Sequence, residues 1–297
     1  MRHDNAILAA CIVGSMSAGV LLPAAGLLVE PYILVWLGAL LFFNLIRLNT
    51  SDLVATFTRP RQLVVLSAVK LAALPLGMYG LAHFLYQPFA LPVLLLSGIS
   101  TGLGAPFLVN LIGGRLPIVV GMIIATSLAV PFVLPSLVYV LVGSKLEIPI
   151  LDMVILLAAA LFTPIAAGWF TKRHFPTASR FADQNSFALS LIFIGLINFG
   201  MFAKFSSYFY DEQVFLLQTV ATAFLCYTAY SIVGYAIAAG DRHERNAGLI
   251  SMSYINNVLV VVLAFQFFGP QVAALAAIYN IPYYAGIVLI KKFMPRQ

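Results

Sequence analysis

Ten long stretches of apolar residues follow one another along the chain and constrain its fold more than any other feature. Hydrophobic residues make up 62% of the 297 residues and charged residues only 9%, whereas an average soluble domain is about 45–50% apolar and about 25% charged. Too few charges remain to cover a soluble surface, which argues against a soluble enzyme, a disordered protein and a disulfide scaffold. A membrane span needs roughly 20 apolar residues, so we predict an all-α membrane protein with ten transmembrane helices, near residues 6–28, 31–48, 62–86, 89–112, 116–143, 147–171, 184–204, 212–239, 246–268 and 270–293.

The two cysteines, Cys11 and Cys226, lie far apart in the sequence, each inside a long apolar stretch. Metal sites need clustered ligands, so we expect no metal site, no cofactor and no structural disulfide. The first apolar stretch is too long for the apolar region of a cleaved signal peptide. We therefore expect it to be kept as the first span.

The basic residues are distributed unevenly between the two sides of the predicted membrane. Cytoplasmic loops of membrane proteins carry an excess of Lys and Arg, so both termini are predicted to lie in the cytoplasm of a cell with a bacterial-type inner membrane. The net charge of +6 is then a topology signal and not a nucleic-acid-binding surface. Numbering the loops alternately leaves only Lys145 and Lys204 on the far side, and the cytoplasmic side receives Arg2, Arg47, Arg59, Arg61, Arg115, Lys172, Arg173, Arg180, Arg242, Arg245, Lys291, Lys292 and Arg296.

The remaining basic residue, Lys70, lies inside the third predicted span. A lysine at the centre of a membrane helix costs about 2.5–3.5 kcal/mol on insertion scales, and such residues are functional candidates by default. The alternative is that the side chain snorkels to the surface, because Lys70 follows Gln62 by eight residues, or about 12 Å along a helix. We favour a functional role.

The two halves of the chain, 1–143 and 144–297, each contain five predicted spans. Five is an odd number, so the halves must have opposite orientations and form an inverted repeat. The fourth span of each half contains a polar interruption. The first reads Ser97-Gly-Ile-Ser-Thr-Gly-Leu-Gly-Ala-Pro106, and the second reads Ser251-Met-Ser-Tyr-Ile-Asn-Asn257.

Interrupted helices at matching positions of two repeats are the best sequence indication of a transporter's binding site. Broken backbone inside a membrane persists only where protein or a watery cavity satisfies its polar groups. Each break also creates a helix N-terminus, whose partial positive charge favours anions. Packing of small residues between helices is the alternative explanation for any one of these residues, but the coincidence of two breaks favours binding.

The same residues resemble a known family. The stretch Ser97–Pro106 followed by Gly113-Gly-Arg115 is similar to the crossing fourth helix of the bile acid:sodium symporter superfamily, and Tyr254-Ile-Asn-Asn257 is similar to its crossing ninth helix. The resemblance implies a panel domain of spans 1, 2, 6 and 7 and a core domain of spans 3–5 and 8–10. It also implies elevator-like movement of the core, and cotransport of organic anions with sodium. Auxin and arsenite carriers share this general plan.

The sodium ligands of the family have no obvious counterparts in this sequence. The family's usual Glu and Gln in the ninth helix align with Ser251 and Ile255, and a Gln of the third helix aligns with Lys70. The Ser–Asn pair of the fourth helix and the hydroxyl ligands of the fifth align with Ala105, Pro106, Val119 and Ile123. An ammonium therefore stands where a cation binds in the family.

We accordingly predict a secondary transporter that moves a small organic anion without sodium, with Lys70 replacing the cation. A buried amine can exist with or without its proton, so either proton coupling or facilitated exchange is compatible with this hypothesis. The residues expected to bind the substrate are Thr101, Gly102, Gly104, Ser251, Ser253, Tyr254, Asn256, Asn257 and Asn280.

Two alternatives stay open. A conventional sodium symporter would use shifted ligands, namely backbone carbonyls together with Ser251, Asn256 and Asn257. A membrane sensor would keep the fold without transport. An enzyme is not expected, because the sequence offers no plausible set of acid, base, nucleophile or metal ligands. The Cys and Glu typical of arsenite carriers and the aspartates typical of sodium/proton antiporters are absent from the corresponding spans.

Overall fold

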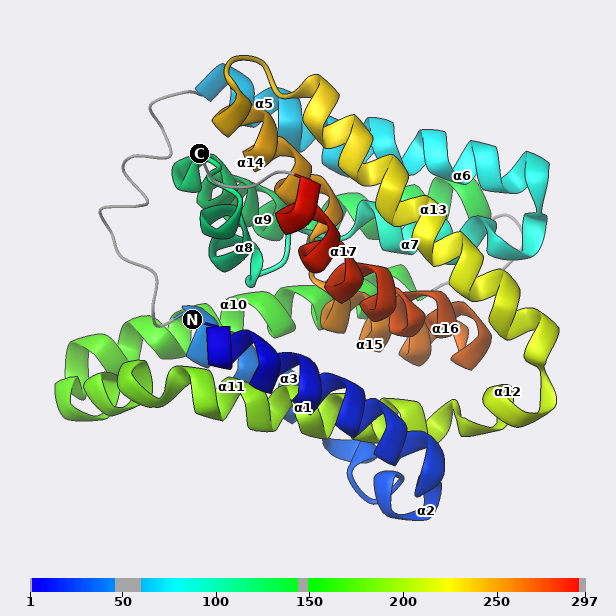
Figure 1. The fold of residues 1–297 in the computed structure, drawn as a ribbon, viewed down its shortest axis with the longest axis horizontal. Coiled ribbons are helices and arrows are strands. Elements are labelled where there is room, and N and C mark those ends of the chain that lie inside the picture. Colours follow the sequence, from blue (N-terminus) through cyan, green and yellow to red (C-terminus); the bar gives the residue numbers. More distant parts are fainter. Residues whose placement is uncertain (1, 46–59, 144–148, 294–297) are drawn as a thin grey trace. The chain divides into compact units, whose positions relative to one another are not determined.

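The computed structural model describes residues 2–45, 60–143 and 149–293, and within these ranges the chain is helical without β-strands (Figure 1). Six helices are long and apolar enough to cross a membrane, which identifies an integral membrane protein; the number of spans, predicted as ten, stays a prediction. Arg47, Arg59, Lys145 and Arg296 lie outside the described residues, so their sides of the membrane stay predictions as well. The six helices are Pro23–Phe43, Pro60–Leu85, Leu116–Val142, Ile150–His174, Pro176–Lys204 and Gln213–Ile237.

Residues 1–48 and 158–218 form one compact unit. In it, α1 (Arg2–Leu21) and α3 (Ile33–Leu45) both pack along the long helix α11 (Pro176–Lys204). Short turns, α2 (Pro23–Gly26) and η1 (Glu30–Tyr32), join α1 to α3. The carboxylate of Glu30 lies 2.7 Å from the ammonium of Lys204 and ties this connection to the end of α11.

The predicted first span, 6–28, is divided in the structure, because α1 ends at Leu21 and α2 begins at Pro23. A residue before proline avoids the helical conformation, and Leu22 accordingly has φ −124° and ψ 56°.

Residues 49–157 and 219–297 form a second unit. Two helices belong to both units: α10 (Ile150–His174) contributes its first eight residues here, and α13 (Gln213–Ile237) contributes residues 219–237. The other elements of this unit are α5 (Pro60–Ala68), η2 (Val69–Ala73), α6 (Leu74–Leu85), η3 (Gln87–Phe89), α7 (Ala90–Gly98), α8 (Ala105–Leu111), α9 (Leu116–Val142), α14 (Arg242–Ser253), α15 (Asn257–Phe268), α16 (Pro270–Ile278) and α17 (Asn280–Phe293).

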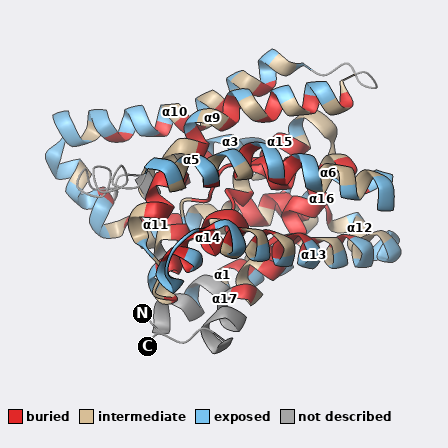
Figure 2. Ribbon diagram, turned by 90° about the horizontal axis from the view of Figure 1, so that it is seen from above, coloured by how far each residue is buried: buried red, intermediate tan, exposed pale blue. Residues whose placement is uncertain are grey.

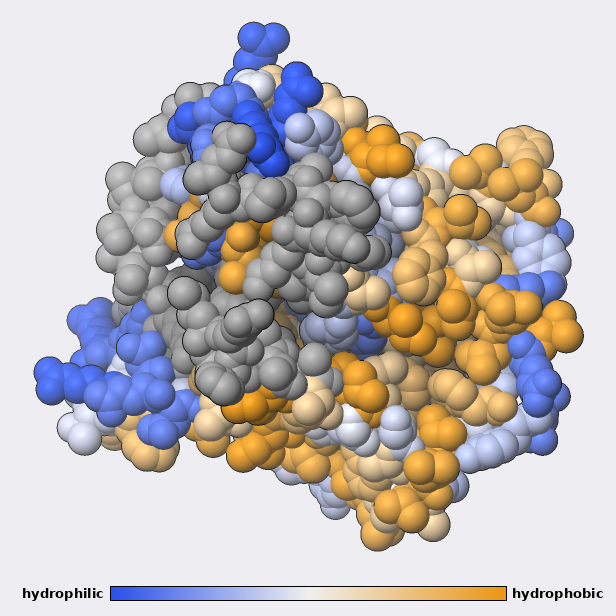
Figure 3. Space-filling model, in the orientation of Figure 1, coloured by the Kyte–Doolittle hydropathy of each residue, from blue (hydrophilic) through white to orange (hydrophobic). Residues whose placement is uncertain are grey.

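The centre of the second unit consists of α7, α15 and α16, which contact one another. Nearly all residues of α7 and most of those of α15 and α16 are buried, as Figure 2 shows in red. A helix that is apolar all round is a buried helix. By contrast, α6 and α13 expose large apolar side chains such as Phe84 and Leu225, and Figure 3 shows hydrophobic side chains gathered over these two helices.

A π-helical turn, η2, interrupts the third predicted span between α5 and α6. Leu74 donates its N–H to Val69, five residues earlier. The next residue is Pro75, which has no N–H and whose ring collides with the carbonyl four residues earlier in a regular helix. The wider turn accommodates this proline, and it contains Lys70. Such turns are frequent at functional sites.

Helices α13 and α14 approach each other at two glycines. A Cβ atom at Gly248 would overlap the carbonyl oxygen of Gly234, and a Cβ atom at Gly234 would overlap the carbonyl oxygen of Gly248. Small residues allow membrane helices to pack backbone against backbone. Only glycine at both positions permits the backbones of α13 and α14 to approach this closely.

We expect Gly248→Ala to lower the stability of the protein by about 1–3 kcal/mol, because the added methyl group forces the two backbones apart. Equilibrium unfolding of the purified protein in mixed micelles measures this loss. Gly77→Ala is the matched control, since a Cβ atom at Gly77 meets no atom within 4 Å. Equal stability of the two variants would contradict the proposed close contact.

Candidate functional site

The two sequence interruptions are breaks in the helices, and the breaks meet inside the second unit. Helix α7 ends at Gly98 and α8 begins at Ala105, while α14 ends at Ser253 and α15 begins at Asn257. Between the breaks, the N–H of Gly102 donates to the carbonyl of Tyr254 at 2.8 Å, and the N–H of Asn256 donates to the carbonyl of Ser100 at 2.9 Å. These bonds form a short antiparallel bridge, which we call the crossing.

Glycine is required at the centre of the crossing. A Cβ atom on Gly102 would overlap the carbonyl oxygen of Ile255. Ile99, at the end of α7, is extended, with φ −72° and ψ 158°, and the hydroxyl of Thr126 from α9 accepts the N–H of Thr101 at 3.0 Å. The first break is therefore held on one side by α9 and on the other by the second break.

The end of α14 exposes carbonyl groups that an unbroken helix would satisfy internally. The hydroxyl of Thr101 donates to the backbone carbonyl of Ser251 at 2.8 Å, and the hydroxyl of Tyr279 donates to the backbone carbonyl of Ser253 at 2.8 Å. The carbonyl between them, that of Met252, accepts from the ammonium of Lys70 at 3.2 Å. Each successive carbonyl at this buried helix end thus has a donor.

Lys70 is completely buried, with 0% of its surface exposed. Its ammonium also lies over the ring of Tyr230, 5.6 Å from the centroid. A cation at a helix C-terminus is stabilised by the helix dipole, and the face of an aromatic ring attracts a cation. The alternative that Lys70 snorkels to the surface is wrong for this structure, because its ammonium is directed to the end of α14.

Three asparagines lie at the start of α15 and of α17. The side chain of Asn256 caps α15 by accepting the N–H of Leu259 at 3.4 Å. Asn257 donates to the side chain of Asn280 at 2.9 Å. All three asparagines are less than 10% exposed. The amide nitrogen of Asn256 and the amide oxygen of Asn257 have no protein partner among the described residues.

The other predicted substrate residues differ in exposure. Ser253 donates to the carbonyl of Leu249, and the hydroxyl of Tyr254 bonds the hydroxyl of Tyr227 at 2.9 Å. Gly104 is exposed, and a Cβ atom there would lie 3.3 Å from the hydroxyl of Tyr283. Sequence reasoning missed Tyr279 and Thr126, whose hydroxyl groups complete the crossing. Thr126 lies inside the apolar helix α9 and Tyr279 in the turn between α16 and α17, and an isolated hydroxyl at either place carries no distinctive signal.

The positions that align with sodium ligands of the resembled family are mostly apolar and buried. Ala105, Val119, Ile123 and Ile255 are all less than 3% exposed. Among the residues whose side chains are described, the buried acid is Glu244, which lies about 12 Å along α14 from Met252. The described residues also contain no group of three or more His, Cys, Asp or Glu side chains that could hold a metal ion.

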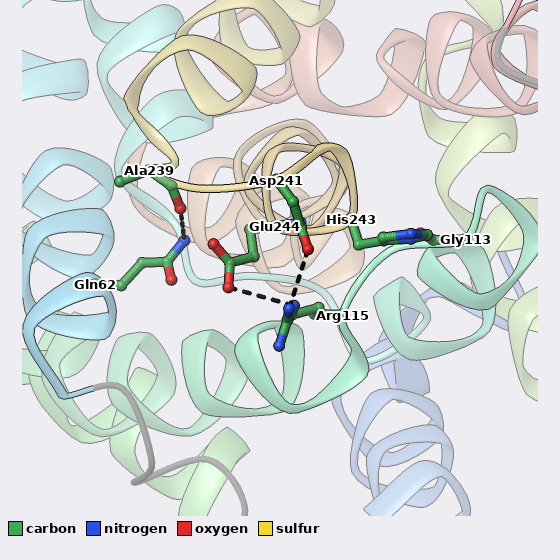
Figure 4. Close-up of polar contacts among 7 residues, drawn as sticks. All are labelled: Gln62, Gly113, Arg115, Ala239, Asp241, His243 and Glu244. Atoms are coloured by element: carbon green, nitrogen blue, oxygen red, sulfur yellow. Dashed lines mark hydrogen bonds and ion pairs between the residues drawn. The ribbon is translucent and has the colours of Figure 1, made fainter.

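The elbow between α8 and α9 is tied to the start of α14 (Figure 4). Arg115 lies 3.0 Å from the carboxylate of Asp241 and 3.3 Å from that of Glu244. His243 bonds the carbonyl of Gly113, and the N–H of Arg115 donates to the carbonyl of His243 at 3.0 Å. Helices α8 and α14, which both adjoin the crossing, are therefore also joined at their ends away from it. We call this set of contacts the clamp.

Charges within the clamp stabilise one another. The N–H of Glu244 and then the guanidinium of Arg115 lower the pKa of the Asp241 carboxyl, and the hydrogen bond to Asp241 raises the pKa of Arg115. Asp241 is the N-cap of α14, accepting the N–H of Glu244 at 2.9 Å. Its carboxylate thus serves the helix cap and the ion pair together.

We expect Asp241→Ala to lower the melting temperature more than Asp241→Asn, because asparagine keeps the helix cap and loses only the charge pair. Thermal unfolding of the two purified variants measures the order. Since the pKa of Asp241 is lowered in the folded state, its ionic contribution is present above the unfolded pKa and disappears as the pH falls through the folded value. The difference between wild type and Asp241→Asn should therefore shrink in acid, and a difference that grew there would contradict the pairing.

Comparison with known proteins decides the family. Residues 34–212 match the model of the Sodium Bile acid symporter family, a stretch that includes Lys70 and the first break. The chain belongs to this family. It is also similar to a protein of Bacillus subtilis (strain 168) described as an uncharacterized sodium-dependent transporter, YocS, with 24% identity over 262 residues, covering 85% of this chain and 79% of that protein.

Membership of the sodium bile acid symporter family confirms the resemblance inferred from the sequence. The chain is a secondary transporter of that family and an integral membrane protein. The family is one of transporters, which are not enzymes.

Proposed function

We propose that this transporter moves a small organic anion by alternating access, and that Lys70 replaces the sodium ion that other members cotransport. The observation that carries the proposal is the ammonium of Lys70 on the carbonyl of Met252, at the broken end of α14. Unwound carbonyls and helix C-terminal ends are the groups with which transporters coordinate sodium. A tethered ammonium satisfies a carbonyl of this kind without a bound ion.

The asparagines of the crossing support an anionic substrate. Asn256 and Asn257 lie at the start of α15, a helix of 12 residues whose N-terminus carries partial positive charge. The amide nitrogen of Asn256 is a buried donor that no protein acceptor uses among the described residues. In this proposal Asn256, Asn257 and Asn280 contact the anion. The hydroxyl group of Thr101 maintains the crossing around it by donating to the backbone carbonyl of Ser251.

The division of the chain into two units supports alternating access. The unit that contains the crossing includes most of the predicted core spans, and the other includes most of the predicted panel spans. In the proposed mechanism, the core carries the substrate past the panel in the manner of an elevator. Both termini lie in the cytoplasm, and the membrane is a bacterial-type inner membrane.

A second candidate is a conventional sodium symporter with shifted ligands. The hydroxyl oxygens of Ser100 and Ser251 and the amide oxygen of Asn257 are buried without a protein partner among the described residues, and sodium prefers oxygen ligands. The relative from Bacillus subtilis is also described as sodium-dependent. The two candidates differ in one measurable property, the requirement for sodium.

We expect organic anions to stabilise the purified protein equally in sodium and in choline buffers. A thermal-shift screen with small carboxylates, sulfates and sulfonates identifies the anion, and uptake of that anion into proteoliposomes then follows in both buffers across a range of pH. A pH-dependent rate would indicate proton coupling, and a pH-independent rate would indicate facilitated exchange. A strict requirement for sodium in either assay would establish the second candidate.

We expect Lys70→Gln to abolish uptake in both buffers. The variant lacks the tethered charge, and the substitution does not restore the sodium ligands that are missing at the other positions. The measurement is the initial rate of uptake by variant protein with an unchanged elution profile in size-exclusion chromatography. Ser67→Ala is the matched control, since Ser67 precedes Lys70 by about one helical turn and its hydroxyl donates to the sulfur of Met122 at 3.4 Å. Wild-type kinetics in Lys70→Gln would reduce Lys70 to a structural role.

A further inference from the structure

The hairpin formed by α10 and α11 carries exposed aromatic and basic side chains next to one another. Trp169, Phe170, Phe175 and Phe181 are each between 50% and 62% exposed. Lys172, Arg173 and Arg180 are exposed in the same stretch of sequence. Figure 3 shows hydrophilic side chains gathered over the tip of this hairpin, beside hydrophobic ones. We call these seven residues the hairpin surface.

The order of side chains along α10 matches the order of environments at a membrane surface. Ile165, Trp169 and Arg173 are spaced by four residues and therefore share one face of the helix. The guanidinium of Arg173 lies over the indole of Trp169, 5.3 Å from the ring centroid. Along this face an aliphatic side chain is followed by an interfacial tryptophan and then by a cation. Tryptophan is enriched at the level of the lipid head groups.

The hairpin surface borders a shallow, open hollow. The ring of His174 is held by the carbonyl of Phe170 at 3.2 Å, which fixes one wall. The hollow is lined by His174, Phe175, Pro176, Thr177, Ala178 and Phe181. Its walls are therefore mainly apolar.

We propose that the hairpin surface binds the head group of an anionic phospholipid, with its acyl chains against the exposed aromatic rings. This stretch contains three exposed basic residues and one exposed acid, Asp183, so its net charge is positive. Basic clusters beside membrane helices attract anionic lipids. The exposed aromatic rings beside these charges favour a lipid over a soluble anion, because the head group would contact the charges and the acyl chains would contact the rings.

The two tryptophans of the chain provide a direct assay, because one of them belongs to the hairpin surface and the other, Trp36, packs against Phe193. In a Trp36→Phe background, Trp169 is the sole tryptophan. The protein is reconstituted in phosphatidylcholine vesicles that contain either brominated phosphatidylglycerol or brominated phosphatidylcholine at the same mole fraction. Quenching of Trp169 fluorescence reports the lipid next to it.

We expect stronger quenching by brominated phosphatidylglycerol than by brominated phosphatidylcholine. Arg173→Gln and Arg180→Gln should each lower the relative affinity for phosphatidylglycerol roughly fivefold, which corresponds to about 1 kcal/mol per basic residue. The matched control is Arg245→Gln, which removes an arginine that also lies over an aromatic ring, that of Tyr235, outside the hairpin. This control should keep the preference.

Three results would overturn the proposal: equal quenching by the two brominated lipids, an unchanged preference in both hairpin variants, or loss of the preference in Arg245→Gln. Competition by soluble glycerol 3-phosphate would show that a free phosphate suffices and would also overturn the lipid assignment. Native mass spectrometry of wild-type protein, with retained phosphatidylglycerol adducts that Arg173→Gln loses, gives a readout independent of the Trp36 substitution.

Discussion

Backbone hydrogen bonds at the crossing are the constraint on which the second unit depends. Two helices that break inside an apolar core leave N–H and C=O groups that neither lipid nor apolar side chains can satisfy. In this chain each broken helix supplies partners for the other, through Gly102 and Tyr254 and through Ser100 and Asn256. The remaining carbonyls of α14 then require donors from outside, which Thr101 in the first break, Lys70 in η2 and Tyr279 after α16 supply.

Lys70 is the donor with the largest consequence. A neutral donor at Met252 would also satisfy the carbonyl, and Thr101 and Tyr279 do so for its neighbours. When it is protonated, Lys70 adds a full charge at a helix end whose dipole is negative, in a unit whose one buried acid among the described side chains is already paired with Arg115. Asp241 and Glu244 therefore lie at the first end of α14 and the amine of Lys70 at its last.

The sequence predicted the breaks because their residues have local physical effects. Glycines and Pro106 weaken helix formation in the first interruption, and the polar residues around Asn256 interrupt the second. The sequence also predicted that Lys70 lies inside a span. It did not predict the partner of Lys70, because Met252 contributes only a backbone carbonyl, which every residue has. The clamp could not be predicted from the sequence, because Arg115 and Asp241 are 126 residues apart and each resembles an ordinary loop charge. Tyr279 and Thr126 act through single hydroxyl groups that depend on tertiary packing.

A tethered cation changes the energetics of transport in a way that a bound ion does not. A sodium ion leaves with the substrate, so an empty symporter and a loaded one can both be nearly neutral when they reorient. The ammonium of Lys70 stays in the unit. With a monovalent anion bound, the proposed carrier would be close to neutral, and without the anion it would hold an uncompensated charge away from water, which is costly. Reorientation without substrate would therefore be slower than reorientation with substrate, unless Lys70 releases its proton. The first case leads to exchange of one anion for another, and the second couples transport to protons. In the proposed carrier the same contact between Lys70 and Met252 would permit either outcome, and a sodium gradient would have no role in either.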